Sequence, residues 1–251
     1  MTFMPMPVDS LSRAPATRVS RDLRPLANCA QCPVRETSIC SVLDRCAMAE
    51  FERMGREAHF APRAMVFMEG APADAVYNVT SGLMRLFRIL PGGQRQIVGF
   101  ALPGDFIGLP PRDRYGFSAD AAVRTIACRF PRDSFAAFAD AHDRFLRRLH
   151  ESAAEALALA HDQMTLLGPR RAEAKVAAFV LAMRRRWGGA HGTGALVPLP
   201  MGRQDIGDYL GLSIATVSRT LTGLERQRLL LIVPQGVRIL NLDGLDQLAA
   251  E

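Results

Sequence analysis

The chain has 251 residues, which is enough to bury a substantial core and is typical of about two domains. Its formal charge of +6 favours a polyanionic partner, and arginine, which supplies nearly all the positive charge, suits planar contacts to phosphate and guanine. No apolar run reaches membrane-spanning length, and no basic segment followed by an apolar core begins the chain. We therefore expect a cytoplasmic protein with no membrane partner.

Five cysteines in a reducing compartment point to metal ligands or free thiols, because disulfides are rare there. Cys29, Cys32 and Cys40 follow the spacing C-x2-C-x7-C and can converge as thiolates on one soft metal centre. The fourth ligand is either Cys46, which would complete a local structural zinc site, or the distant Cys128. With Cys128, the centre would pin the N-terminal segment across the following domain. The alternative is a set of buried free thiols.

Short β-rich runs separated by glycine and proline follow the cysteines. The segment 91–93, Pro-Gly-Gly, predicts a hairpin between two of these runs. A series of this kind predicts a barrel or jelly roll. A cupin-like enzyme or small-molecule binding barrel would need histidines or carboxylates inside, and no histidine lies between Phe60 and Pro131, so we expect no enzyme. The expected strands are 64–68, 75–79, 83–89, 95–100, 103–108 and 121–130.

A long helix is predicted after the strands, and it ends at Gly168 and Pro169, which form a natural hinge. Apolar residues recur along it every three or four positions, as suits a partner helix. Packing against the chain's own barrel is the alternative, but the small alanines permit close approach and favour a symmetric homodimer. The expected dimer contacts are Leu149, Ala153, Leu157, Ala160, Met164 and Leu167. A further helix at 170–187 is expected to turn Val176, Phe179, Val180 and Met183 inward.

The stretch 205–221 predicts two short helices joined by a tight turn. Gly207 is small enough for the second helix to cross closely, Gly211 supplies a permissive backbone, and Ser213 is a good N-cap. The second helix is expected to bury a stripe formed by Ile214, Val217, Leu221 and Leu224. Its other face carries residue types that read base edges and bind phosphates in the major groove of double-stranded DNA. The expected DNA contacts are Ser213, Thr216, Ser218, Arg219 and Thr222.

An ordinary helical hairpin with a solvated polar face is the alternative to this DNA-binding interpretation. Runs of β-forming residues at 229–233 and 237–240, joined by Pro-Gln-Gly, follow the second helix directly. A helix-turn-helix followed by a two-stranded wing is typical of a winged-helix domain, so we favour DNA binding.

Together these features resemble the CRP/FNR family of bacterial transcription regulators. The most specific matches are Asp205-Ile-Gly-Asp-Tyr-Leu-Gly-Leu, Thr216-Val-Ser-Arg and Pro103-Gly-Asp-Phe-Ile-Gly. The resemblance implies an α+β fold with a β-roll (jelly-roll, cyclic-nucleotide-binding-like) sensor domain, a long dimerisation helix and a C-terminal winged helix-turn-helix. The expected divisions are a disordered tail at 1–25, a cysteine-rich segment at 26–58, the β-roll at 59–139, the dimerisation helix at 140–168 and the DNA-binding domain at 169–251.

The cysteine arrangement is similar to that of the FNR-type oxygen sensors. The resemblance implies an oxygen-labile 4Fe-4S cluster held by Cys29, Cys32, Cys40 and Cys128. It also implies that the cluster favours a homodimer on an inverted-repeat promoter site, where RNA polymerase is the further partner, and that oxygen dismantles the cluster. A regulator of the same family that senses through haem, zinc or thiol oxidation is the alternative.

The chain departs from the family pattern in the second helix of its helix-turn-helix and in its β-roll. Ala215 stands where the family usually carries a glutamate, and a glutamate accepts a hydrogen bond from cytosine N4. We expect the preference at one base pair to change by about 1–3 kcal/mol. The stretch from Gly108 to Tyr115 lacks the Gly-Glu segment and nearby arginine that bind a cyclic-nucleotide phosphate. We therefore expect no cyclic nucleotide and interpret the β-roll as a signal relay.

Overall fold

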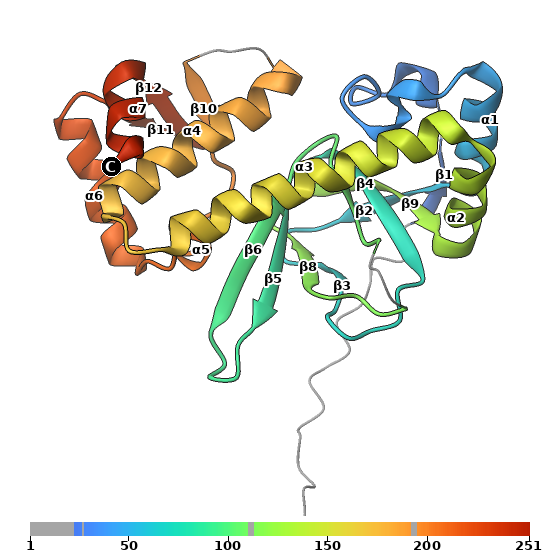
Figure 1. Ribbon diagram of the computed structural model, residues 1–251, viewed down its shortest axis with the longest axis horizontal. Helices are drawn as coiled ribbons and strands as arrows, with labels where there is room; N and C mark the ends of the chain where they lie inside the picture. The colour runs from blue at the N-terminus through green and yellow to red at the C-terminus, as the bar shows by residue number, and fades with distance from the viewer. Residues whose placement is uncertain (1–22, 27, 110–112, 192–194) are drawn as a thin grey trace, which may run out of the picture.

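The computed structural model describes residues 23–26, 28–109, 113–191 and 195–251, so most of the predicted tail lies outside the described residues. Figure 1 shows one long helix, α3 (Asp143–Leu167), crossing the whole molecule. The β-roll lies along one side of α3, while the cysteine-rich segment covers its beginning and the DNA-binding domain surrounds its end. Among the described helices, none is both long and apolar enough to cross a lipid bilayer.

The β-roll consists of two sheets whose facing sides bury a core that includes Phe60, Phe67 and Tyr77. One sheet has the order β1-β2-β9-β4-β7 and the other the order β3-β8-β5-β6. This confirms the fold class predicted from the sequence. The strands of the first sheet are β1 (Leu23–Pro25), β2 (Arg56–Phe60), β9 (Thr125–Pro131), β4 (Ala75–Ser81) and β7 (Phe106–Ile107). Those of the second are β3 (Met65–Phe67), β8 (Ser118–Ala121), β5 (Met84–Ile89) and β6 (Arg95–Ala101).

Two details of the β-roll differ from the sequence-based expectation. The single strand expected at 121–130 is two strands, β8 and β9, in different sheets, because the chain bends between Ala121 and Thr125 and crosses from one sheet to the other. Residues 23–25, which were expected to belong to a disordered tail, add a strand to the sheet edge instead, because Leu23 pairs with Ala58. Backbone pairing thus orders residues whose composition resembles that of a disordered segment.

The cysteine-rich segment is short and helical: η1 (Cys29–Gln31), η2 (Ile39–Val42) and α1 (Arg45–Met54), with Asp44 capping α1. An additional helix, α2 (Arg132–Ala141), precedes α3 and breaks at His142, so the helical region begins earlier than expected. These elements meet in an aromatic core, where the ring centroid of Phe51 lies 4.2 Å from that of Phe130 and 5.2 Å from that of Phe145. The core fixes the cysteine-rich segment to β9 and to the beginning of α3.

The DNA-binding domain contains the predicted helices and two elements that the sequence did not suggest. Strand β10 (Leu196–Pro198) joins the wing, whose order is β10-β12-β11, with β11 spanning Leu230–Val233 and β12 spanning Gly236–Ile239. A final helix, α7 (Leu242–Ala250), packs on α4 (Ala172–His191) and buries Leu245. The predicted inward face of α4 is buried. The helix-turn-helix comprises α5 (Arg203–Leu210) and α6 (Ile214–Arg226).

Replacing Gly207 by alanine is expected to destabilise the DNA-binding domain by about 1–3 kcal/mol, because the added Cβ strains a packed contact. That Cβ would lie 2.5 Å from the backbone oxygen of Leu212. Gly223 on α6 is a matched control, since a Cβ there meets nothing within 4 Å and should stabilise the helix by about 0.5–1 kcal/mol. Urea unfolding followed by circular dichroism measures both. Equal midpoints for the two variants would contradict the close crossing.

Candidate functional site

The helix-turn-helix has the local geometry that its sequence predicts. Gly211 ends α5 in the left-handed region, with φ of 67°, and Ser213 accepts a hydrogen bond from the Thr216 backbone N–H at 3.1 Å. Ile206 and Leu210 of α5 and Val217, Leu221 and Leu224 of α6 are buried. The turn and the helix cap thus hold α6 at a fixed angle across α5.

The predicted reading face of α6 is open to solvent at its N-terminal end. Ser213 and Arg219 are exposed, Thr216, Ser218 and Thr222 are half-buried, and Arg219 donates to the Thr216 hydroxyl at 3.4 Å. Ile214, which was expected to be buried, is 48% exposed, because the first turn of α6 projects beyond the packing surface of α5. The side chains that the sequence singled out for base reading therefore share one accessible surface with Ile214.

The cysteine side chains divide into a group and an outlier. Cys128, on β9, is paired across the sheet with Glu57 of β2 and Asn78 of β4. Paired residues of adjacent strands point to the same side, so the Cys128 side chain lies on the outer face of the sheet, where Cys29 and Cys40 pack into the same core cluster. Cys46 is exposed on α1.

The thiols of the group perturb each other's ionisation. Burial, and then the charge of Glu52, raises the pKa of Cys29 to about 12, with Cys40 and Cys32 adding to the effect. Burial raises the pKa of Cys40 to about 11, and Ser38 opposes this by hydrogen bonding. The pKa of Cys128 is raised by burial and then by Cys40, Cys29 and Cys32. Mutual influence of this kind requires the thiols to lie near one another, and Cys46 does not contribute.

Two observations bear on what this group of thiols can hold. Among the described residues, no three His, Cys, Asp or Glu side chains converge closely enough to bind a single metal ion. The buried side-chain oxygen of Asn78, beside Cys128, finds no hydrogen-bond partner in the part of the chain that the structure describes. An unpaired buried amide oxygen is unfavourable unless a hydrogen-bond donor reaches it.

The interior of the β-roll is filled by the chain's own aromatic side chains. The ring of Phe67 stacks on that of Tyr115 with centroids 3.9 Å apart, and Tyr77 lies 5.9 Å from Phe67. The Tyr115 hydroxyl donates to the backbone oxygen of Ala75 at 2.7 Å, so it is already satisfied. This packing is consistent with the expectation that no cyclic nucleotide binds, which remains a prediction because residues 110–112 lie outside the described ranges.

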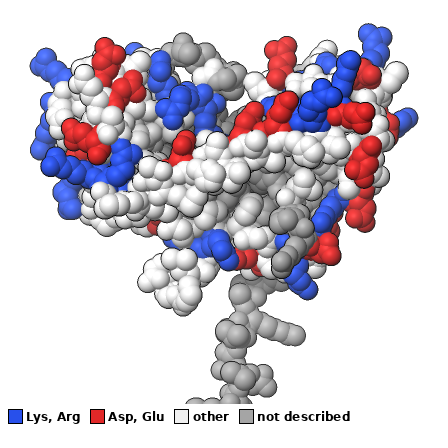
Figure 2. Space-filling model, in the orientation of Figure 1, with Lys and Arg blue, Asp and Glu red and all other residues white. Residues whose placement is uncertain are grey.

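The predicted dimer contacts on α3 do not all share one environment. Leu149 belongs to the chain's own aromatic core. Further along, Ala153, Leu157, Ala160, Met164 and Leu167 are exposed, with Leu157 at 57% and Met164 at 60%. Figure 2 shows a largely uncharged surface over the second half of α3, whereas acidic and basic side chains crowd its beginning. Large apolar side chains exposed in a row are typical of a protein interface.

Comparison with known proteins places the chain in a family. Residues 57–142 match the cyclic nucleotide-binding domain model, and residues 174–248 match the Crp-like helix-turn-helix domain model. The chain is 48% identical to the transcriptional activatory protein AadR of Rhodopseudomonas palustris over 87% of its own length and 92% of that protein. This chain belongs to the CRP/FNR family of transcription regulators. The members of this family are DNA-binding regulators and not enzymes, in agreement with the prediction from the sequence.

Other relatives of this CRP/FNR regulator cover most of its length. The transcriptional activator protein FnrL of Cereibacter sphaeroides is 30% identical over 80% of this chain and 83% of that protein. The solved structure of FixK2 from Bradyrhizobium japonicum superposes with a TM-score of 0.73 at 35% identity, covering 78% of this chain and 98% of that one. The arrangement of β-roll, long helix and winged helix-turn-helix is therefore shared with FixK2.

Several residues around the thiols could not be found from the sequence. Glu52 accepts hydrogen bonds from the Asn28 backbone at 3.0 Å and from the Cys29 side chain. Glu57 and Asn78 flank Cys128 across the sheet. Their sequence contexts, a helix end and two strands, carry no motif, because only the strand register brings them to the thiols.

In the reduced, metal-free protein, Cys46 is expected to react with iodoacetamide at pH 8 at least about tenfold faster than Cys29, Cys40 or Cys128. The thiolate is the reactive form, and a raised pKa together with burial lowers the reactive fraction of the latter three. Peptide mass spectrometry over time measures the rates, and labelling in urea, where all sites should react alike, is the control. Faster labelling of Cys128 than of Cys46 would contradict the packing.

Proposed function

We propose that this CRP/FNR regulator is an oxygen-responsive transcriptional activator that binds an inverted-repeat promoter site as a homodimer. The observation that carries the proposal is the packing of Cys29, Cys40 and Cys128 against one core cluster, with Cys32 close to Cys29 in the chain, whereas Cys46 is exposed on α1. The printed names of the relatives AadR and FnrL, both activators, support the direction of regulation.

We favour a 4Fe-4S cluster over a zinc ion as the group that these cysteines would hold. Zinc requires its sulfur ligands at about 2.3 Å from a single point. A cluster takes each thiolate on a different iron, so its ligands stand further apart. When bound, such a cluster would supply an oxygen-labile centre held by Cys29, Cys32, Cys40 and Cys128.

The chain's own residues explain how thiol ligation can influence distant parts of the protein. Ile39, in the same η2 element as Cys40, is buried in the aromatic core together with Phe145 and Leu149 of α3. Ligation would tie η1 and η2 to β9 through Cys128 and so hold that core against α3. Without ligation, packing alone holds the segment, and burial disfavours the thiolate form of Cys29 and Cys40. The beginning of α3 is therefore more firmly placed in the ligated protein.

Dimerisation through α3 is supported by the exposed row of apolar residues that follows Leu149. Ala153, Leu157, Ala160 and Met164 lie at the three- and four-residue spacing of a helix-packing seam. A homodimer presents two copies of α6 related by a two-fold axis, and such a pair reads half-sites of inverted symmetry. In each copy, Arg219 is the side chain suited to guanine, and the exposed Ala215 and Ile214 suit a thymine methyl group.

Substituting Cys128→Ser is expected to abolish iron and sulfide incorporation during anaerobic reconstitution, because it removes the ligand from β9. Cys46→Ser is the matched control and should incorporate both like the wild type. Metal and sulfide analysis, together with the visible absorbance of the reconstituted protein, measures the outcome. Air exposure of the loaded wild type should weaken binding to an inverted-repeat DNA.

One zinc per chain with no sulfide would refute the sensor proposal while leaving the DNA-binding assignment intact. Full cluster loading in Cys128→Ser combined with loss in Cys46→Ser would refute Cys128 as the fourth ligand, because the ligand set would then be local to the N-terminal segment.

Replacing Arg219 by alanine is expected to cost about 1–3 kcal/mol of binding free energy at one guanine and to relax the base preference there. Arg226→Ala, near the end of the same helix, should leave the preference at that base pair unchanged. Binding to a set of single-base variants of the site, measured at one fixed salt concentration, tests this. Uniform weakening on all sequences would instead make Arg219 a phosphate contact.

A further inference from the structure

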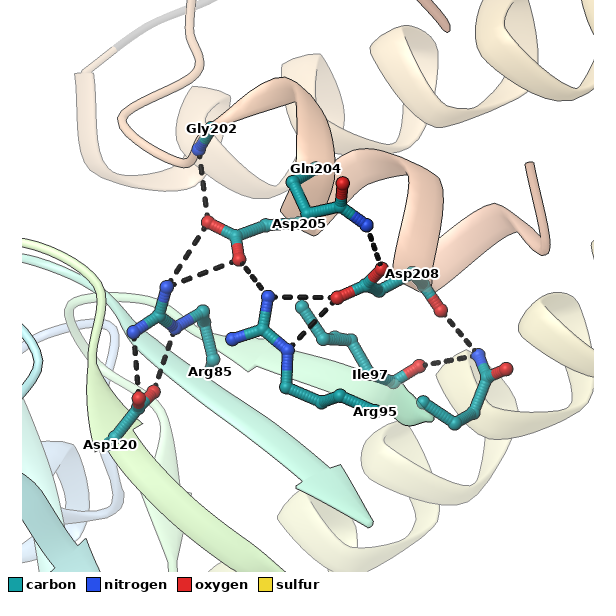
Figure 3. Close-up of polar contacts among 9 residues, drawn as sticks. Arg85, Arg95, Ile97, Asp120, Gly202, Gln204, Asp205 and Asp208 are labelled. Carbon is teal, nitrogen blue, oxygen red and sulfur yellow. Dashed lines mark hydrogen bonds and ion pairs between the residues drawn. The ribbon is translucent and has the colours of Figure 1, made fainter. Parts of the chain in front are cut away.

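Ionic contacts join the β5–β6 hairpin of the β-roll to α5 of the DNA-binding domain (Figure 3). Arg85 of β5 donates from Nη1 to Asp205 at 3.1 Å. Arg95 of β6 donates from Nη2 to Asp205 at 2.6 Å and from Nε to Asp208 at 2.9 Å. We call these residues, Arg85, Arg95, Asp205 and Asp208, the interdomain latch. It joins positions that lie 110 to 120 residues apart in the chain.

The neighbours of the latch hold its side chains in place. Asp120, directly across from Arg85 on β8, accepts from Nε and Nη2 of Arg85 at 2.7 Å each. The Gln96 side chain donates to the Asp208 backbone oxygen at 2.6 Å. The arginine forks therefore meet their partners in fixed, largely bidentate directions.

The latch lies in the interface and away from solvent. The side chains of Arg85 and Asp205 are 9% and 8% exposed, and those of Arg95 and Asp208 are 26% and 12% exposed. Burial lowers the pKa of Arg85, but the hydrogen bonds and charges of Asp120 and Asp205 outweigh it and raise the pKa. A buried charge that loses its partner is strongly unfavourable, so arrangements that separate these groups are disfavoured.

Apolar contacts elsewhere hold the two domains together without fixing their angle. Phe100 of the β-roll packs on Tyr209 and Phe179 with ring centroids 5.4 Å and 6.2 Å away. Arg186 of α4 also pairs with Asp105. Hydrophobic contact is non-directional, whereas the arginine forks accept their carboxylates in few orientations. The latch, together with the Arg186–Asp105 pair, is therefore the directional part of the interface.

The orientation of α5 is passed on to the reading helix. Asp205 sits in the first turn of α5, where it also accepts from the Gly202 backbone N–H at 3.0 Å. Gly207 brings α5 against the turn that leads into α6, so the two helices move as one unit. None of the latch residues belongs to α6, and the exposed Ser213 and Arg219 remain accessible while the latch is closed. The latched form is thus able to meet DNA.

We infer that Arg85 and Arg95 are positioning residues for DNA recognition: through Asp205 and Asp208 they fix the angle at which each β-roll presents its reading helix. In a dimer this angle sets the separation of the two reading helices, and hence the half-site spacing that the protein accepts. The inference rests on the proposed dimeric reading of an inverted repeat. Half-sites read by one dimer lie about one helical turn of DNA apart, so a small change in angle matters.

The test uses the full-length protein, the variant Arg95→Met and a series of inverted repeats whose half-sites are moved apart by single base pairs. Methionine keeps most of the aliphatic length of Arg95 and removes its guanidinium group, whose central carbon lies 5.9 Å from the centroid of the Phe87 ring. The matched control is Arg88→Met, an exposed arginine of the same hairpin that pairs with Glu69 and not with α5. A second latch variant, Asp208→Asn, removes the partner carboxylate from the other domain.

The wild type should bind one spacing best. Arg95→Met and Asp208→Asn should lose about tenfold in affinity for that spacing, because the competent orientation is less populated, and should discriminate less among the other spacings. Affinity for a single half-site should not change, and Arg88→Met should behave like the wild type.

Unchanged spacing selectivity in both latch variants would overturn the inference, as would tighter binding, which would make the latch inhibitory. An equal loss on the single half-site would overturn it too, because the latch would then act on the fold of the reader. A wild type that shows no spacing preference would instead refute the proposed dimeric reading.

Discussion

The packing of the cysteine-rich segment onto β9 and the first turns of α3 is the constraint from which the rest of the arrangement follows. Phe51 brings its ring against Phe130 of β9 and Phe145 of α3, so a short N-terminal segment touches both the sensor sheet and the long helix. A change in the packing of the cysteines would therefore act on the buried beginning of α3. Its exposed apolar row begins only beyond Leu149.

The end of α3 is joined to the helix-turn-helix by polar contacts, just as its beginning is packed against the cysteine-rich segment. The only lysine of the chain, Lys175, is buried, and its ammonium lies 3.5 Å from the backbone oxygens of Leu167 and Leu210. These are the last residues of α3 and α5, where free carbonyl groups favour a cation. Gln163 of α3 adds hydrogen bonds to Ile97 of the β-roll and to Tyr209. Lys175 and Gln163 thus form a polar junction that joins the β-roll, α3 and the helix-turn-helix.

Sequence reasoning succeeded where the physical cause is local. The left-handed Gly211, the Ser213 cap and the buried stripe of α6 depend on residues within a few positions of each other. The local sequence pattern is therefore sufficient to predict them. It was less accurate where a strand or helix end depends on remote partners. The three residues of β1 are ordered by β2, and β10 by β12, neither of which lies nearby in the chain. Ile214 is exposed because the apolar stripe begins in the first turn of α6, whereas the buried part of the helix begins at Val217.

By itself the sequence determined the class of protein, because the helix-turn-helix motif and the cysteine spacing each lie within a short, contiguous stretch. Only the tertiary structure places Cys128 in the same core cluster as Cys29 and Cys40 and leaves Cys46 exposed, because the register of β9 in its sheet turns Cys128 toward that cluster. The same holds for the latch. Arginines of a hairpin and aspartates of a helix look like ordinary surface charges until the domain interface buries them opposite one another.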